Sequence, residues 1–265
     1  MKAPSWARMR AVLLQEYYIT IRSLEVILDL YFFSAMSVTV FGLTSIYLSK
    51  SIHGSGAYYL LLGTVLWEVV RISQYSMSVS SLWNVWSHNL SNMFVTPLSL
   101  TEYLGAQMIS SVFKMLLAMA IISGLAIGLF HLDLLSIGAF NLAMFTVNLS
   151  IFAWALGLAL LGLIFCFGTR IQALAWGVVF IFQPLCAAFF PVSYLPQPVR
   201  AVSLALPPTH VFEAARMALG SGTVEWSEIG WMFVLNVVWS VIGLLVFLRL
   251  VRRSRRSGQF AKNDQ

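Results

Sequence analysis

Charged residues are scarce in this chain, since Asp, Glu, Lys and Arg make up 10% of its 265 residues while 59% are hydrophobic. A soluble domain usually carries about 25% charged residues. A water-soluble fold could not hide this much apolar surface, because too few polar side chains are available to face the solvent. The composition therefore excludes an ordinary soluble domain and predicts an all-α polytopic membrane protein.

Cysteine is almost absent as well. Cys166 and Cys186 both lie inside apolar runs, and neither has a His or Cys neighbour at metal-ligand spacing. We therefore expect small core side chains and no metal site. The chain also lacks GxSxG and HExxH motifs, which argues against hydrolytic chemistry. We expect no catalytic residue and no enzyme activity.

A nucleotide-binding loop of the form GxxxxGK[ST] is missing, and no Gly-Lys pair occurs anywhere in the chain. Such a loop cradles nucleotide phosphates with its backbone N–H groups. Without it we expect no nucleotide cofactor and no ATP hydrolysis by this chain. Any ATP-driven process would take its energy from a separate chain.

What the sequence does have is long hydrophobic runs. A membrane span takes about 20 mostly apolar residues, and six runs qualify: 26–48, 57–80, 103–130, 137–166, 171–190 and 230–250. With both termini on the cytoplasmic side, most Lys and Arg residues would be cytoplasmic, and only Lys50, Arg200 and Arg216 would lie outside. This asymmetry predicts a multi-pass protein with its N- and C-termini inside.

The net charge of +6 is concentrated after the last apolar run, at Arg249, Arg252, Arg253, Arg255 and Arg256. A basic cluster next to a span attracts anionic lipid headgroups. We therefore expect residues 251–265 to form a basic cytoplasmic tail that contacts membrane lipid. This position also argues against a nucleic-acid partner.

Residues 5–24 have helical periodicity of their own. Apolar side chains recur every three or four positions, at Trp6, Met9, Leu13, Tyr17, Ile21 and Leu24. This pattern predicts an amphipathic helix that lies in the inner interface of the membrane. The alternative is a cytoplasmic extension of the first span.

The segment 86–103, WSHNLSNMFVTPLSLTEY, is polar and stands between two long apolar runs. It contains a Thr-Pro-Leu-Ser turn. The predicted orientation places this segment in the cytoplasm, where a polar helix between two spans is suited to contact with a partner protein. We expect a short helix over about residues 86–100, roughly parallel to the membrane.

Proline is uncommon except in one region, since five of the eight prolines lie at Pro191, Pro196, Pro198, Pro207 and Pro208. Between them, residues 199–206 are apolar but too short to span. Broken apolar half-helices at membrane depth need protein or a cavity to cover the freed backbone. We therefore expect a re-entrant or interfacial hairpin on the outer side, before the last span.

These features together resemble the permease subunit of the ABC type-2 exporter family. The residues that carry the resemblance are Leu90 to Tyr103, centred on Thr96-Pro97-Leu98-Ser99, and the segments 191–196 and 206–213. The similarity extends over nearly the whole chain. It implies six transmembrane helices, an interfacial N-terminal helix, a cytoplasmic coupling helix between spans 2 and 3, and short extracytoplasmic helices between spans 5 and 6.

The resemblance also implies partners and a location. The chain would work in a prokaryotic plasma membrane as a homodimer, or as a heterodimer with a related permease, on two ABC ATPase subunits that bind ATP and Mg²⁺. It would export an amphipathic, lipid-linked or polysaccharide substrate or a drug. The residues expected to contact the ATPase are Trp86, His88, Leu90, Phe94, Thr96, Pro97 and Leu98.

Glu68 and Arg71 stand three positions apart in the second run, where they can pair on one helix face. They form either a structural ion pair or part of a transport pathway. The following half of the run is polar, which indicates either close helix packing or an aqueous vestibule. Its polar residues are Ser73, Gln74, Ser76, Ser78, Ser80, Ser81 and Asn84.

Three further features have both a structural and a functional interpretation. Asp29 and Lys114 are single charges inside apolar runs, and Lys114 could snorkel to the interface. Gln183-Pro184 should kink the fifth span, as a hinge or for packing. The rings near the outer hairpin belong to an exit gate or to an interfacial aromatic belt; they are Phe189, Phe190, Tyr194 and Phe212.

Two other functions compete with the exporter. A secondary transporter often shows two related halves with broken helices at matching places, whereas the broken region occurs here only once. A lipid-modifying membrane enzyme would need a nucleophile and base, or a metal cluster, at one membrane face. The four histidines are instead scattered along the chain.

Overall fold

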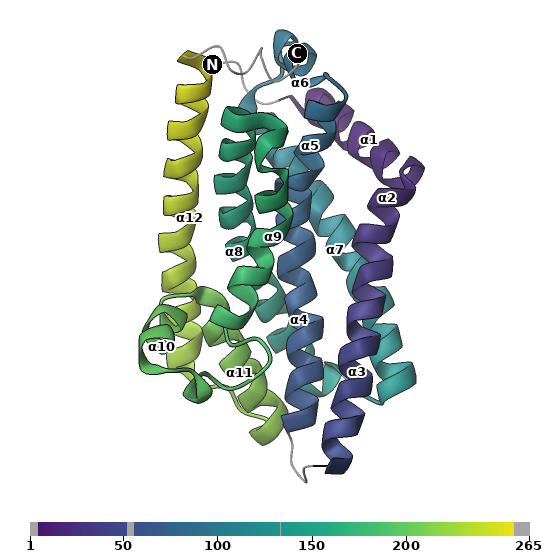
Figure 1. Ribbon diagram of the computed structural model, residues 1–265, viewed down its shortest axis with the longest axis vertical. Helices are drawn as coiled ribbons and strands as arrows, with labels where there is room; N and C mark the ends of the chain where they lie inside the picture. The colour runs from purple at the N-terminus through teal and green to yellow at the C-terminus, as the bar shows by residue number, and fades with distance from the viewer. Residues whose placement is uncertain (1–4, 52–55, 133, 257–265) are drawn as a thin grey trace.

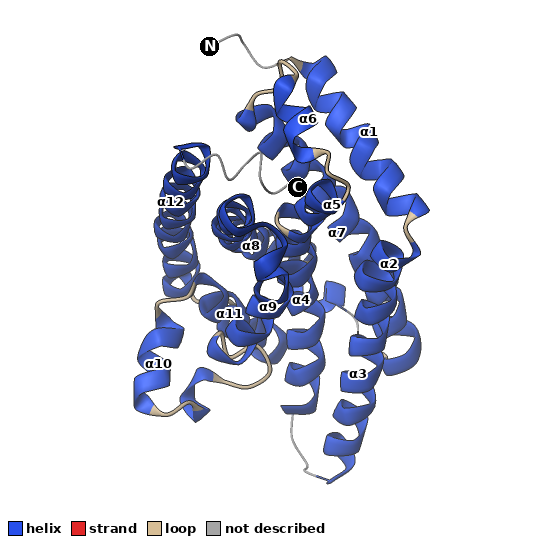
Figure 2. Ribbon diagram, turned by 45° about the horizontal axis from the view of Figure 1, so that its top comes forward, coloured by secondary structure: helices blue, strands red, loops and turns tan. Residues whose placement is uncertain are grey.

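A computed structural model describes residues 5–51, 56–132 and 134–256. Within these ranges the chain forms helices and no strand (Figures 1 and 2). The long helices pack side by side as a bundle, and α3, α4, α7, α8, α9 and α12 run along it in alternating directions (Figure 1). The all-helical prediction is confirmed for the described residues.

The first helix, α1 (Trp6–Arg22), lies obliquely across one end of the bundle (Figure 1). Ser23 has an extended backbone that ends α1, and its hydroxyl accepts a hydrogen bond from the N–H of Val26. The chain then turns into a continuous rod along the bundle. This rod consists of α2 (Leu24–Ile27), the π-helical turn η1 (Leu28–Phe32) and α3 (Phe33–Ser51).

The middle of the bundle is α4 (Gly56–Met77), which contacts α3, α7 and α8. A break at Ser78 separates α4 from α5 (Val79–Trp86). The short α6 (Leu90–Val95) follows, and α7 (Leu100–Phe130) then returns along the bundle. The helix that corresponds to the predicted run 57–80 therefore ends at Met77.

The second half of the chain begins with a 3-10 turn, η2 (Leu134–Ile137), and α8 (Ala139–Phe167). A second 3-10 turn, η3 (Gly168–Ile171), reverses the chain into α9 (Gln172–Leu185). The region between α9 and the last helix, α12 (Trp226–Arg256), holds three short elements. They are η4 (Val192–Tyr194), α10 (Gln197–Leu204) and α11 (Pro207–Ser221).

Four helical segments of the described chain are long and apolar enough to cross a membrane: Leu24–Lys50, Leu100–Phe130, Ala139–Leu185 and Trp226–Arg256. The third of them contains both α8 and α9, on either side of the η3 reversal. α4 is not among the four. Glu68, Arg71 and the polar residues near its end lower its hydropathy, and nearly all its described side chains are buried by neighbouring helices.

α9 is shorter than the predicted span 171–190, because it ends at Leu185. Pro184 is the last residue but one of this helix, so it lies at the helix end and not at a kink in the middle. Ala187, two residues beyond the helix, has a left-handed backbone with φ of 51°. The chain changes direction there and enters the proline-rich region.

Close backbone contacts join α8 to α12. A Cβ atom on Gly243 would lie 2.3 Å from the carbonyl oxygen of Ala155, so only glycine fits this contact. The amide of Asn236 donates to both the side-chain and the backbone oxygen of Asn148, at 2.9 and 3.1 Å. Small residues and interhelical amide bonds are typical of helix packing inside membranes.

Large apolar side chains cover much of the outer surface of α3, α7 and α12. On α12 they include Val237, Val241 and Leu245. Polar residues would dominate such faces in a water-soluble bundle. The exposed apolar faces therefore fit a bundle that lies in lipid, in agreement with the composition.

The two ends of the bundle differ. α1, α6 and the carboxyl end of α12 lie at one end, and α10 and α11 lie at the other (Figure 1). Figure 2 shows the same separation from a second direction. The segment predicted to contact a partner and the proline-rich region are therefore on opposite ends of the molecule.

Candidate functional site

The turn from α5 to α7 is built by local backbone geometry. His88 has a left-handed backbone, with φ of 51°, and the N–H of Asn89 donates to the carbonyl of Asn84 at 2.9 Å. These features end α5 and turn the chain into α6. α7 then begins with a capping box, in which Ser99 and Glu102 bond each other's backbone N–H groups.

The outer surface of this turn is exposed. Val95 is 86% exposed, although it is a large apolar residue, and Thr96 and Pro97 are also exposed. His88 is exposed, whereas Trp86 and Leu98 are half-buried. Leu90 and Phe94 belong to α6, but their side chains lie outside the described part of the structure. The helix is shorter than predicted, at six residues.

α1 holds this turn from the inner side. The guanidinium of Arg8 donates to Oε1 of Glu102 at 2.9 and 2.6 Å, and the N–H of Ser5 donates to the same oxygen at 2.6 Å. Oε2 of Glu102 accepts from the N–H of Ser99 at 2.8 Å. One buried carboxylate thus joins the start of α1 to the start of α7.

A second set of contacts joins α1 to α5 and α6. The side-chain amide of Gln15 donates to Oδ1 of Asn84 at 2.6 Å and contacts the buried Met93 of α6. A small groove of about 290 Å³ remains between α1 and the turn. Thr96, Pro97 and Leu98 line its outer wall, and Arg8 and Gln15 line its inner wall.

Deeper in the bundle, Glu16 and Lys114 form a buried ion pair with Nζ 2.8 Å from Oε2. The carboxylate of Glu16 also accepts from the hydroxyl of Ser80 at 2.5 Å and from the amide of Gln107 at 3.0 Å. Tyr103 continues the network, since its hydroxyl bonds Ser81 and Gln107. α1, α5 and α7 are therefore held together by one polar cluster.

The sequence pattern alone did not identify this cluster. The side chains of Trp6, Tyr17 and Ile21 from the predicted apolar stripe are exposed, which is compatible with a helix at the membrane interface. The opposite side of α1 packs on the bundle and buries Glu16, and the pattern did not show what this residue would contact. Lys114 does not snorkel, because Glu16 neutralises it within the bundle. The available signal was a single Lys inside an apolar run and a single Glu in residues 5–24, since intramembrane charges usually pair.

The residues predicted to form a pathway lie around a second cavity, between α3, α4 and α9. Glu68, Arg71 and Gln74 all line it, together with Asp29. Its volume is about 560 Å³. The structure thus brings together three predicted pathway residues and one charge whose role the sequence left open.

The Glu68–Arg71 ion pair is formed, with Nε of Arg71 2.7 Å from Oε2 of Glu68. The remaining donors of Arg71 bind the carbonyls of Asp29 and Leu30 and the hydroxyl of Ser34. Those carbonyls belong to the π-helical turn, whose wider backbone ring shifts the usual helical hydrogen bonds. Arg71 therefore joins α4 to α3 at the irregular part of the rod.

The polar half of α4 and α5 is not exposed. Ser73, Ser76, Ser78, Ser80 and Ser81 are all buried, as are Gln74 and Asn84. Gln74 reaches α9, where its amide donates to the carbonyl of Ala175 at 3.1 Å. In this structure the small polar residues serve close helix packing, the first of the two interpretations given above.

Another ion pair organises the turn after α9. Arg216 donates to Glu213 at 2.8 Å and to the carbonyl of Ala187 at 3.0 Å, and Glu213 accepts from the N–H of Val192. The turn also packs directly on α4. A Cβ atom on Gly63 would lie 1.9 Å from the carbonyl oxygen of Ala188.

The four rings predicted for an exit gate occupy different environments. Tyr194 is 79% exposed, Phe189 and Phe190 are half-buried, and Phe212 is 1% exposed. Phe212 packs on Trp67 of α4 in the core. Phe189 stacks on Phe41, with ring centroids 4.8 Å apart, and Phe41 lines the cavity beside α4.

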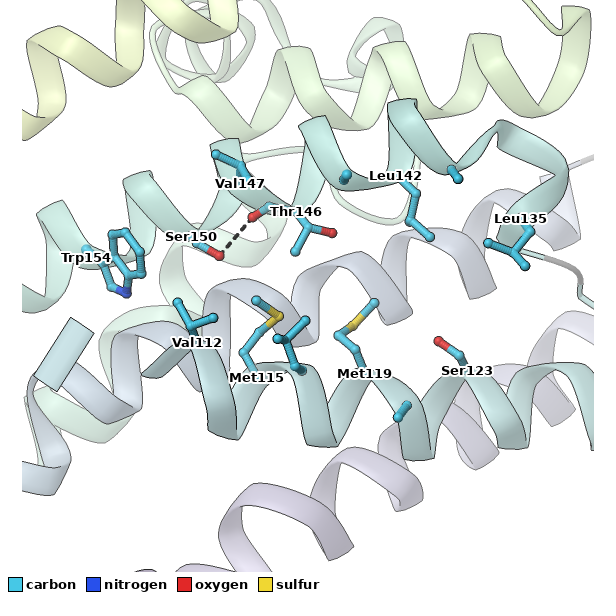
Figure 3. A pocket seen from close by; sticks show the side chains of 14 residues that line it. Val112, Met115, Met119, Ser123, Leu135, Leu142, Thr146, Val147, Ser150 and Trp154 are labelled. Atoms are coloured by element: carbon cyan, nitrogen blue, oxygen red, sulfur yellow. Dashed lines mark hydrogen bonds between the residues drawn. The ribbon is translucent and has the colours of Figure 1, made fainter. Parts of the chain in front are cut away.

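A third cavity lies between α7 and α8 (Figure 3). It has a volume of about 490 Å³ and an almost entirely apolar lining that includes Met115, Met119 and Leu142. The hydroxyl of Ser150, which lines the cavity, donates a hydrogen bond to the backbone carbonyl of Thr146 (Figure 3). No ionised group lines this cavity, so it has the character of a lipid-chain groove.

No family model matches this chain, and no curated protein matches it in sequence. Groups of three or more His, Cys, Asp or Glu side chains that could hold a metal ion do not occur within the described ranges.

Proposed function

We propose that the protein is the transmembrane subunit of an ATP-driven exporter of the ABC type-2 class. A separate ATPase would bind ATP and Mg²⁺ and act on the turn between α5 and α7. The substrate would be amphipathic, lipid-linked, a polysaccharide or a drug. Two copies of the chain would enclose the pathway, since a two-fold arrangement is the commonest for oligomers of identical chains.

The observation that carries this proposal is the exposed α6 turn. An apolar residue that is 86% exposed, Val95, lies beside the exposed Thr96 and Pro97 at the end of the bundle. A short helix with an apolar tip is suited to insertion into a groove of a partner protein. The turn is also held firmly from behind by Arg8 and Gln15 of α1.

That firm attachment is what a coupling element needs. A force on α6 reaches the bundle only if the turn moves together with the helices beneath it. Glu102 joins the turn to α1, and the Glu16–Lys114 pair joins α1 to α7 deeper in the bundle. We infer that α1, α6 and the start of α7 move as one body when the ATPase changes state.

In this proposal six segments span the membrane: α2 with α3, α4, α7, α8, α9 and α12. α4 can be a span although it is less apolar than the others, because neighbouring helices surround it and it meets little lipid. α1, α6 and the end of α12 share one end of the bundle. This arrangement supports a cytoplasmic location of both chain ends, with α10 and α11 outside.

The coupling role is tested at Val95, because its side chain is exposed and makes few contacts within the chain. The variant Val95→Asp places a charge on the contact surface, and Val95→Thr is a control of the same shape. Both should insert and unfold like the wild type. With Val95→Asp, the ABC ATPase encoded in the source genome should no longer co-purify with the chain, or ATP hydrolysis should no longer be coupled to transport. Val95→Thr should retain both the co-purification and the coupling.

The coupling proposal would be wrong if Val95→Asp bound and drove the ATPase like the wild type. It would also be wrong if no ABC ATPase co-purified with the wild-type chain. In the second case a secondary transporter becomes the better explanation, and substrate uptake into vesicles should then follow an ion gradient instead of ATP.

A further inference from the structure

The cavity between α3, α4 and α9 has the form of a binding groove. It follows η1 and α3 from Asp29 to Phe41, and these twelve steps along the chain correspond to about 18 Å of helix. Its volume of about 560 Å³ is within the range of sites for drug-sized molecules. The ionised groups gather near Asp29, and the lining toward Phe41 is apolar, so the groove is itself amphipathic.

The charge of the groove is negative. Three ionised side chains line it, and Arg71 forms an ion pair with Glu68, so these two charges cancel. Asp29 remains. Its Oδ2 atom is buried and has no hydrogen-bond partner among the described residues. A buried carboxylate oxygen is costly unless a hydrogen-bond partner or an opposite charge compensates it.

Arg71 has little capacity to bind an anion, because four of its five N–H groups already have partners. Its Nε atom donates to Glu68, its Nη1 atom to the carbonyl of Asp29, and its Nη2 atom to Ser34 and the carbonyl of Leu30. A phosphate or carboxylate ligand would have to displace these bonds and would also face the negative charge of Asp29. The groove therefore disfavours anionic head groups.

Aromatic rings make up much of the remaining lining. They come from all three helices: Phe33, Phe41, Trp67, Tyr75, Trp176 and Phe180. The faces of such rings attract organic cations, most strongly for Trp. Aromatic rings around one uncompensated carboxylate are the elements that recognise ammonium or phosphonium groups attached to an apolar body.

We propose that this groove is a binding site for lipophilic organic cations, with the cationic centre beside Asp29 and the apolar body along Phe33, Phe41 and Phe180. The binding site itself does not depend on the proposed exporter function. Only the conclusion that the bound cation is also exported rests on that function. As an exported substrate, such a ligand would reach the outer end of the groove at Phe41. The ring of Phe189 stacks on Phe41 there and connects the groove to the turn after α9.

The test uses the full-length chain in nanodiscs of neutral lipid, without an ATPase. The probe is tetraphenylphosphonium, and the matched control is tetraphenylborate, an anion of nearly the same size and shape. Binding is measured by equilibrium dialysis after subtraction of empty nanodiscs. We expect saturable binding of the cation and no saturable binding of the anion.

Two variants in the groove and one control outside it test whether the cation binds there. Asp29→Asn keeps the size of the side chain and removes its charge, and we expect it to weaken cation binding at least tenfold. Glu225→Gln removes an exposed carboxylate just before α12, at the other end of the bundle and outside the groove, and it should leave binding unchanged. Phe180→Leu keeps an apolar lining without the ring and should weaken binding severalfold.

The site assignment is wrong if the cation and the anion bind equally, or if Asp29→Asn and Glu225→Gln have the same effect. Because no ATPase is present, these results are independent of the coupling test at Val95. If the chain does not bind the cation but still couples to the ATPase, the proposed class of ligand is wrong and the exporter function stands. If the chain binds the cation but captures no ATPase, the binding site is supported and the exporter function is contradicted.

Discussion

The Nζ atom of Lys114 lies 2.8 Å from the Oε2 atom of Glu16, and this buried contact joins α7 to α1. Both side chains are almost fully inaccessible, so each charge depends on the other for compensation. Removal of one partner from a buried ion pair is strongly destabilising, whereas removal of both is much less so. The pair therefore holds α1 in position on the bundle.

We expect Glu16→Gln and Lys114→Met each to lower the free energy of unfolding by about 3 kcal/mol. Each variant leaves one uncompensated charge beside Ser80 and Gln107. The double variant should recover a large part of this loss. Thermal unfolding of the purified chain in detergent measures the effect, and Glu25→Gln, at an exposed carboxylate, is the control. Equal losses in the single and double variants would contradict the prediction.

A second prediction concerns the contact of α8 with α12. Gly243→Ala adds a Cβ atom against the backbone oxygen of Ala155. Neither backbone can move without disturbing the neighbouring turns, so we expect a loss of about 1–3 kcal/mol in stability. Gly230→Ala is a control on the same helix, with no atom within 4 Å of the added carbon. It should be neutral or stabilising, because alanine favours helix.

The arginines at the end of α12 should interact with lipid. Arg252, Arg253, Arg255 and Arg256 are all exposed, and each basic residue near an anionic membrane contributes about 1 kcal/mol. Replacing all four with Gln should abolish most of the increase in melting temperature that anionic nanodiscs give the wild type. In neutral nanodiscs the variant and the wild type should melt alike. A large difference in neutral lipid would indicate a protein contact instead.

The turn after α9 should lie near its counterpart in a homodimer. Tyr194 is exposed at this end of the molecule, whereas Cys166 and Cys186 are buried. Tyr194→Cys should therefore give a disulfide-linked dimer that depends on the nucleotide state of the ATPase, with no background from the native thiols. Absence of the crosslink in every nucleotide state would show that this turn is only an interfacial anchor.

The sequence by itself determined the class of the molecule. Because 59% of the residues are hydrophobic and 10% are charged, they had to form helices with their backbone hydrogen bonds satisfied internally. The positions of α1, α6 and the hairpin helices were also predictable. Prolines at 191–208 exclude one continuous helix, and the Ser99–Glu102 spacing is a recognisable capping box.

The spacing of Glu68 and Arg71 predicted their ion pair, but which charges of different helices meet depended on the tertiary structure. Glu16 and Lys114 are 98 residues apart in the chain, and no local periodicity connects them. The wheel of residues 5–24 predicted an apolar side that faces the membrane interface, but it did not predict that Glu16 on the other side would neutralise a lysine of the bundle. Because a buried Lys114 without a counter-ion would be costly to desolvate, the side of α1 that carries Glu16 packs on the bundle.

The burial and the contacts of single residues likewise could not be predicted from the sequence. Phe212 and Tyr194 are both aromatic residues of the proline-rich region, yet one packs on Trp67 and the other is exposed. Asp29 and Glu68 are both carboxylates in apolar runs next to Arg71, but only Glu68 forms an ion pair with it. Local sequence fixes the helices, whereas burial and pairing depend on which helix faces meet, and this is decided by the packing of the whole bundle.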